Sequence, residues 1–138
     1  MAQLPIHTIY HKWDLNNNYK VFSQCDCGII PLNKKNLFGW HKPANKLISF
    51  WFTGLPSVVS ATPAYKELMD NANEKLYCSG IEDWVEKIEQ VKNMTTAERE
   101  ILVKKNIVYV RNNYSDEALD LSWYQTFEKI TSTEITNL

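Results

Sequence analysis

Residues 39–65 read GWHKPANKLISFWFTGLPSVVSATPAY, and they predict in turn a polar loop, a short helix, a tight turn and a buried strand. Pro43 suits the first turn of a helix, where its missing N–H costs nothing, and Gly54 is placed to end that helix. We therefore expect a helix over residues 43–53. Its apolar side chains follow helical spacing and form one stripe that would face a core: Leu47, Ile48, Trp51 and Phe52.

The polar face of this helix begins at its N-terminus, where free backbone N–H groups and the helix dipole attract anions. Lys42 and Lys46 add positive charge at the same end. These features predict a phosphate site, and they fit a solvated basic helix start equally well.

The whole chain has 138 residues, of which 44% are hydrophobic and 12% aromatic, enough for one domain with its own core. Its 15 basic and 16 acidic side chains leave a formal net charge of -1, so the composition does not indicate the excess of positive charge that attracts nucleic acid. No apolar run reaches the roughly 18 residues of a transmembrane helix, and no signal-peptide pattern opens the chain. We expect a cytoplasmic protein; peripheral attachment at the inner face of the membrane is compatible with this composition.

Three cysteines, Cys25, Cys27 and Cys78, argue against a disulfide framework and indicate reduced thiols. Cys25 and Cys27 are separated by one residue, whereas paired zinc ligands usually have a wider spacing and a second pair elsewhere. We therefore expect neither a metal nor a resident cofactor.

The rest of the chain alternates between strand and helix patterns. Strands are expected at residues 6–13, 25–32, 57–60 and 75–78. The apolar run at 25–32, closed by Pro31, predicts a strand buried on both faces. Helices are expected at residues 15–24, from Pro63 through Met69, after a capping box of Ser79 and Glu82, after a capping box of Thr95 and Glu98, and after Ser115. This order predicts a three-layer α/β/α, Rossmann-like parallel sheet of about four strands.

Two features lie outside the alternating pattern. A polar loop at residues 33–42 follows the second expected strand, at the edge where open α/β sheets bind ligands. The last two helices have no strand after them, so we expect a C-terminal pair that packs on another surface, with a polar tail that frays over about residues 131–138.

Four segments together resemble the C-terminal, nucleotide-sugar-binding half of a GT-B fold glycosyltransferase. They are CDCGIIPL at 25–32, KPANKLISFWFTGLPSVVSATPAYKELM at 42–69, LYCSGIEDW at 76–84 and MTTAEREILVKKNIVYVRNNYSDEALDLSW at 94–123. The resemblance lies in their order and in the Gly-Leu-Pro turn at 54–56 that follows the basic helix. It implies a partial donor-binding domain of a hexosyltransferase-type enzyme, which binds a nucleotide-sugar as substrate in polysaccharide or glycoconjugate synthesis.

The resemblance also implies where the donor binds. The diphosphate would contact Lys42, Ala44, Asn45, Lys46 and Ser49. His41 and Lys46 would be the catalytic residues, because positive charge near the leaving diphosphate stabilises the charge that develops there. Trp13, at the end of the first expected strand, would flank the nucleobase, although a rim residue closing the core is the more common role for tryptophan.

This chain departs from the family pattern in two ways. Two glutamates separated by seven residues are common in retaining members, and His41 and Ser49 stand at those positions here. The acceptor-binding domain and the first strands of the donor domain have no counterpart, so we expect the chain to be inactive without an acceptor-binding domain or chain. The alternative is a non-catalytic Rossmann-like module that docks a partner domain, with a homodimer through an exposed sheet edge as one outcome.

Overall fold

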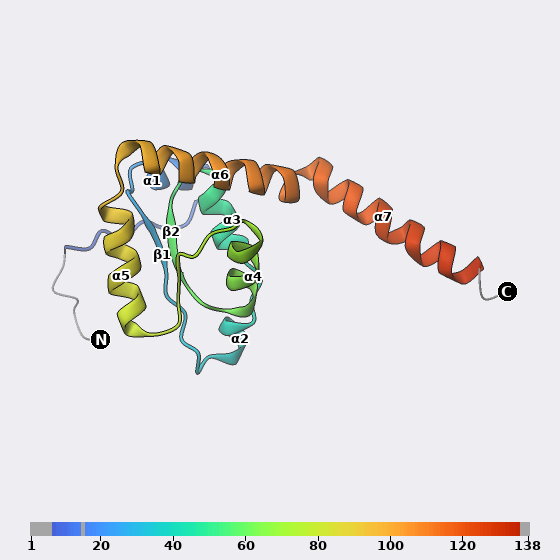
Figure 1. The fold of residues 1–138 in the computed structure, drawn as a ribbon, viewed down its shortest axis with the longest axis horizontal. Coiled ribbons are helices and arrows are strands. Elements are labelled where there is room, and N and C mark those ends of the chain that lie inside the picture. Colours follow the sequence, from blue (N-terminus) through green and yellow to red (C-terminus); the bar gives the residue numbers. More distant parts are fainter. Residues whose placement is uncertain (1–6, 15, 136–138) are drawn as a thin grey trace.

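Three short parallel strands lie at the centre of the molecule (Figure 1). They are β1 (Gly28–Ile30), β2 (Ser57–Ser60) and β3 (Tyr77–Cys78). β2 is central, with Val58 opposite Ile29 of β1 and Val59 opposite Tyr77 of β3. All of β2 is buried, as expected for a β-branched strand between two parallel neighbours. The expected α/β class and parallel pairing are confirmed.

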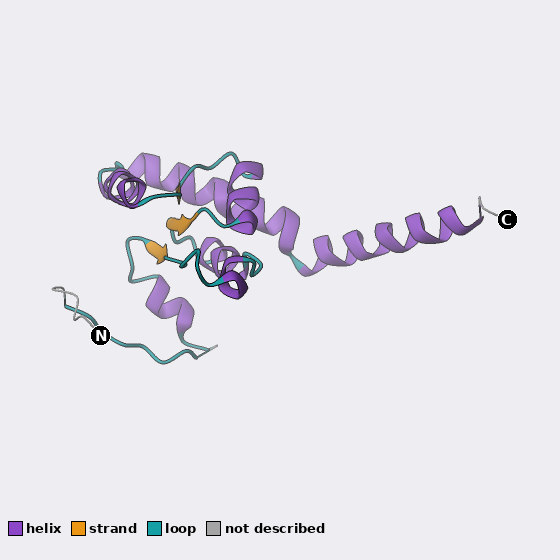
Figure 2. Ribbon diagram, turned by 90° about the horizontal axis from the view of Figure 1, so that it is seen from below, coloured by secondary structure: helices purple, strands orange, loops and turns teal. Residues whose placement is uncertain are grey.

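Seven helices accompany this sheet in the computed structural model, which describes residues 7–14 and 16–135. They are α1 (Asn18–Phe22), α2 (Leu37–Trp40), α3 (Asn45–Phe52), α4 (Pro63–Asn71), α5 (Ile81–Lys92), α6 (Thr96–Tyr114) and α7 (Asp116–Ile135). The two ribbon views place α3 and α4 on one side of the strands and α5 on the other (Figures 1 and 2). α6 packs along α3, and α7 projects away from the body.

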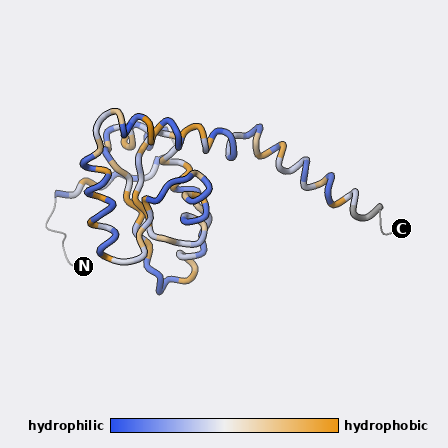
Figure 3. The backbone as a smooth tube through the Cα atoms, viewed as in Figure 1, coloured by the Kyte–Doolittle hydropathy of each residue, from blue (hydrophilic) through white to orange (hydrophobic). Residues whose placement is uncertain are grey.

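The core lies between the sheet and the inner faces of the surrounding helices, where the hydrophobic residues gather (Figure 3). On α3, Leu47 and Trp51 are both fully buried, because residues four apart share one helix face. This confirms the predicted apolar stripe at these two positions. Phe52 lies one step further round the helix and is 39% exposed, so its expected place in the core is wrong.

The strand expected at residues 6–13 is not formed. Residues 7–14 are irregular and exposed, and Ile6 lies outside the described residues. The sheet of the described chain therefore has three strands instead of about four. The prediction rested on β-rich composition, but β propensity chiefly reflects packing against neighbouring strands, and this segment has none.

β1 is an edge strand, not one buried on both faces as residues 25–32 had predicted. It pairs only with β2 among the described residues, and the exposed fraction of Ile29 is 48%. Gly28 donates its N–H to Pro56 O (2.8 Å). Because alternate residues of a strand face opposite neighbours, the N–H and C=O of Ile29 point to the open side. The apolar run alone did not distinguish an edge strand from a central one.

Capping signals locate two helix starts closely. Thr95 and Glu98 form the predicted box: Thr95 N–H donates to Glu98 Oε2 (2.8 Å), and Glu98 N–H donates to Thr95 Oγ1 (3.3 Å). The box expected at Ser79 is shifted by one residue, because Asp83 Oδ2 accepts from Gly80 N–H (3.1 Å) and Gly80 becomes the N-cap. Two adjacent carboxylates follow this turn, and sequence spacing alone did not choose between them.

Four helices differ from the sequence-based expectation, and α3, at Asn45–Phe52, is shorter than the expected residues 43–53. α1 is shorter than residues 15–24, and α2 forms inside the expected polar loop because Asn36 Oδ1 accepts from Gly39 N–H (3.0 Å) and caps it. α7 is helical as far as Ile135, through the described part of the tail expected to fray, and residues 136–138 lie outside the described chain. Of the expected C-terminal pair, α6 packs on the body and α7 projects from it (Figure 1).

Asp70, near the end of α4, is the centre of a small ionic cluster. Its carboxylate accepts hydrogen bonds from Lys66, Lys75 and the hydroxyl of Tyr77 (3.2 Å). The hydrogen bond from Lys66, followed by that from Lys75, lowers the pKa of Asp70 from its ordinary value of 3.8 to about 2. A carboxylate whose pKa is lower in the folded state stabilises the fold above its unfolded pKa and loses that effect as pH falls through the folded value.

We therefore expect thermal stability to fall as pH drops from 3.8 to about 2, and Asp70→Asn to make that fall shallower. Circular-dichroism melts at several pH values would measure both profiles. Glu89→Gln, at an exposed carboxylate of α5 outside the cluster, is the matched control and should keep the slope of the wild type. Parallel profiles for wild type and Asp70→Asn would show that the cluster does not contribute.

Candidate functional site

A groove of about 530 Å³ runs along the open side of β1, between this strand, α1 and α3. We call it the β1 groove. Its apolar lining consists of Phe22, Ile29, Ile30, Pro31, Leu32 and Phe50. The remaining lining residues are Trp13, Asn45, Lys46 and Ser49. The groove is therefore apolar along the strand and polar where α3 begins.

The path of the chain sets the polar end of the groove at one edge of the sheet. α3 connects the parallel strands β1 and β2, so it runs back against them, and its first residues lie level with the carboxyl end of β1. Open α/β sheets bind ligands at this edge. Ser60 fixes the floor there, because its hydroxyl accepts from Leu32 N–H (2.7 Å) and donates to Leu32 O (3.3 Å).

The opposite end of the groove is closed by two aromatic rings. Phe22 of α1 packs edge-on against Phe50 of α3, with ring centroids 4.8 Å apart and an interplanar angle of 75°. Gly28 makes this possible, since a Cβ atom at that position would lie only 2.6 Å from the Phe50 ring. The glycine in the CDCGIIPL segment therefore allows α3 to approach β1 closely.

The polar end of the groove carries positive electrostatic character. Ala44 is the N-cap of α3 and offers no side-chain cap, and the first turn has no acidic residue. The first backbone N–H groups of α3 are thus not neutralised by a local carboxylate, and Lys46 adds a cation beside them. The hydroxyl of Ser49 donates to Asn45 O (2.9 Å), which leaves the Ser49 oxygen able to accept a further hydrogen bond.

The groove brings together four of the residues that the sequence singled out: Trp13, Asn45, Lys46 and Ser49. Ala44 is buried and borders a separate cavity. His41 and Lys42 line neither space; His41 is exposed at the end of α2, and Lys42 Nζ lies 5.0 Å from the ring centroid of Phe38. The expected set is therefore divided between the groove and the connection that precedes α3.

The separate cavity, of about 230 Å³, lies between α3, α4 and the end of α6. Its polar groups are those of Asn45, Glu67, Asn71 and Tyr114. Burial is the main cause that raises the pKa of Tyr114, followed by the neighbouring Tyr109 and Glu67. The carboxylate of Glu67 disfavours an anionic ligand here, so the β1 groove is the better candidate for a phosphate group.

The thiols of Cys27 and Cys78 are not activated. Burial is the main cause that raises the pKa of Cys27, and burial raises the pKa of Cys78 to about 11. Both thiols therefore stay protonated near neutral pH. Within the described residues, no three His, Cys, Asp or Glu side chains gather into a group suited to a metal ion.

Sequence reasoning missed the apolar half of the groove. Phe22 and Phe50 are 28 positions apart in the numbering, and Ile29 had been assigned to a strand buried on both faces. Helical spacing does place Asn45, Ser49 and Phe50 around one side of α3, so α3 carried a usable signal. The contribution of α1 depends on tertiary packing, so the sequence contains no local signal for it.

Comparisons of the chain with protein-family models, with curated proteins and with solved structures found no match. A functional assignment therefore rests on the residues of the groove, its geometry and the order of the sequence segments. In the part of the chain that the structure describes, no helix combines the length and the apolar character needed to cross a bilayer.

Proposed function

We propose that this chain is the donor-binding part of a glycosyltransferase and that a nucleotide-sugar binds in the β1 groove. The observation that supports this most directly is the meeting of Trp13, Asn45, Lys46 and Ser49 in one groove at the carboxyl edge of a parallel sheet. A volume of about 530 Å³ also falls within the range of small-molecule sites, roughly 300 to 1,000 Å³.

In this proposal each part of the groove contacts a different part of the donor. Lys46 and the first N–H groups of α3 bind the diphosphate, and the Ser49 oxygen accepts a hydrogen bond from a ribose hydroxyl. The face of Trp13 and the apolar floor hold the base. As the glycosidic bond breaks, its electron pair moves to the diphosphate oxygen, and Lys46 stabilises the negative charge that develops there.

The proposal extends to the wider architecture. The three strands would belong to a Rossmann-like, three-layer donor domain of the GT-B type, and an acceptor-binding domain or chain would supply the second substrate. His41 ends α2 outside the groove lining, so its catalytic role requires residues 41–44 to move toward the bound sugar. Such an enzyme would act in polysaccharide or glycoconjugate synthesis in the cytoplasm, where nucleotide-sugars are the substrates.

We expect uridine and guanosine diphosphates and their hexose conjugates to be the probes that reveal binding in a calorimetric titration. Lys46→Ala should raise the dissociation constant of the nucleotide about tenfold to hundredfold, since a hydrogen bond to a charged group contributes roughly 1.5–3 kcal/mol. Lys104→Ala, which removes an exposed lysine of α6 outside the groove lining, is the matched control and should bind like the wild type.

Two results would count against the proposed function. The first is the absence of saturable heat with every nucleotide at millimolar concentration. The second is an equal loss of nucleotide affinity in Lys46→Ala and Lys104→Ala, which would mean that the nucleotide is attracted by general positive charge and not by the groove.

Trp13→Ala should also lower the affinity for nucleotide in the same titration, because base–aromatic stacking contributes about 1–3 kcal/mol.

A non-catalytic module that docks a partner domain is the second candidate, and the open side of β1 favours it. Purely parallel sheets are normally covered on both faces and at their edges, whereas Ile29 of β1 is about half exposed beside a mostly apolar groove. A module of this kind would bind protein through the groove and show no affinity for nucleotides, so the titration separates the two candidates.

A further inference from the structure

α7 leaves the body of the molecule, and the two ribbon views agree on this (Figures 1 and 2). Residues 119–132 of this helix are all exposed. Helices in proteins gain most of their stability from packing an apolar face, and helices isolated in water are marginal. A helix of 20 residues that projects in this way therefore calls for a surface that covers one of its faces.

One face of α7 is suited to being covered. Its apolar side chains recur at helical spacing and form what we call the α7 stripe: Leu119, Trp123, Phe127 and Ile130. Trp123 and Phe127 are stacked, with ring centroids 5.9 Å apart, and are 63% and 59% exposed. At about 1.5 Å per residue the stripe extends roughly 16 Å along the helix. Spaced anchors of this kind are typical of a helix that binds in an apolar groove.

The acidic side chains of α7 restrict the kinds of surface that can cover the α7 stripe. The acidic residues of α7 outnumber its basic ones, and Asp116 and Asp120 lie at helical spacing from Trp123, on the side of the stripe. An anionic membrane surface attracts helices rich in lysine and arginine, so this helix is unsuited to one. Two α7 helices paired with each other would place like charges together. The complementary surface is an apolar groove with positive charge beside it.

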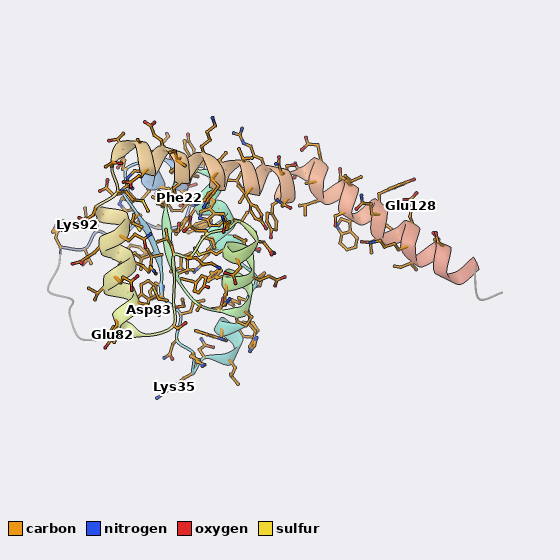
Figure 4. All side chains as sticks on the ribbon, in the orientation of Figure 1. Phe22, Lys35, Glu82, Asp83, Lys92 and Glu128 are labelled. Atoms are coloured by element: carbon orange, nitrogen blue, oxygen red, sulfur yellow. The ribbon has the colours of Figure 1, made fainter. Side chains whose placement is uncertain are left out.

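The β1 groove has these properties. Its floor is apolar, Lys46 lies at its polar end, and lysines outnumber acidic residues in the surrounding segment, residues 7–53. α7 of the same copy points away from it: Figure 4 shows Glu128 on the projecting helix, far from Phe22 at the groove. The molecule that brings an α7 stripe to this groove is therefore a second copy of the chain.

We propose that two copies exchange α7, so that the stripe of each lies in the β1 groove of the other. The arrangement is symmetric and closed, as in most homo-oligomers, and it covers both the open side of β1 and the aromatic face of α7. This exchange of α7 involves the same groove as the proposed donor site. It does not require that the groove also binds a nucleotide. A groove filled by α7 excludes the nucleotide, so the two occupants compete.

Sedimentation of the full chain from about 1 µM to about 200 µM, without nucleotide, tests the exchange. We expect a reversible dimer. Trp123→Asp should raise its dissociation constant about tenfold or more, because buried aromatic anchors dominate such interfaces. Tyr124→Asp is the matched control: Tyr124 is 62% exposed, like Trp123, but lies off the stripe, and its replacement should leave the constant nearly unchanged.

A charge exchange tests where the stripe binds. Lys46→Glu and Asp120→Lys should each weaken the homodimer, because like charges then meet in both of its contacts between residues 46 and 120. An equimolar mixture of the two variants should dimerise again. In the mixed dimer one contact pairs the introduced glutamate with the introduced lysine, and the other keeps the native Lys46 and Asp120. A chain that stays monomeric at every concentration would overturn the proposal. So would equal effects of Trp123→Asp and Tyr124→Asp, or a mixture that fails to recover, which would indicate an interface elsewhere. Titrating monomeric Trp123→Asp with nucleotide tests the donor site separately.

Discussion

Trp51→Ala is expected to remove about 3–5 kcal/mol from the free energy of unfolding, the range for truncating a fully buried tryptophan. Trp51 is 1% exposed on the inner face of α3 and meets the edge of Tyr109 in α6, with ring centroids 6.2 Å apart. Its removal opens a cavity between the two helices that pack most closely. Because small domains have a total stability of about 5–15 kcal/mol, this loss is a large fraction of the whole.

The indole of Trp51 makes a clean test, because its Nε1–H has no hydrogen-bond partner among the described atoms, and truncation breaks no such bond. Chemical denaturation followed by circular dichroism would give both free energies. The neighbouring Phe52, 39% exposed on the same helix, is the matched control, and Phe52→Ala should cost less than half as much. Similar losses for both variants would show that α3 does not anchor the core through Trp51.

The helix, turn and strand of residues 43–60 were predictable because their signals are local. A β-branched run gave β2 its bounds, which match the predicted 57–60, and the position of Gly54 ended α3 within one residue of the prediction. The helix start was less certain: Pro43 precedes α3, which begins at Asn45. In each case a residue's own backbone preference decides the outcome, so no distant neighbour was needed.

The edge of the sheet was not predictable in the same way. Residues 7–13 have strand-like composition, yet a strand forms only where a neighbour offers paired backbone groups. Ile29 has the sequence environment of a buried residue, yet its side chain is 48% exposed on a strand whose one described partner is β2. The polar half of the β1 groove followed from α3 alone, whereas its apolar half depends on how α1 packs against Phe50.

Gly54→Val is expected to lower the free energy of unfolding by about 2–3 kcal/mol, for two reasons that act together. Gly54 has a φ of 75°, in the left-handed region where a β-branched residue is strained by roughly 1–2 kcal/mol. A Cβ atom there would also lie 3.2 Å from Val103 Cγ1 of α6, so the Val103 side chain would have to shift by a few tenths of an ångström to make room. Thermal and chemical denaturation would measure the loss.

Gly80→Val is the matched control for this turn. Gly80 has a φ of -136°, which any residue adopts, and no atom lies within 4 Å of a Cβ placed there. Its replacement should cost under about 1 kcal/mol, mainly as a poorer N-cap for α5. Because Gly54 is the residue that turns α3 into the central strand, equal costs at the two glycines would mean that the backbone reverses there without needing glycine. The position of α3, and with it the polar end of the β1 groove, would then have to be set by packing against α6 alone.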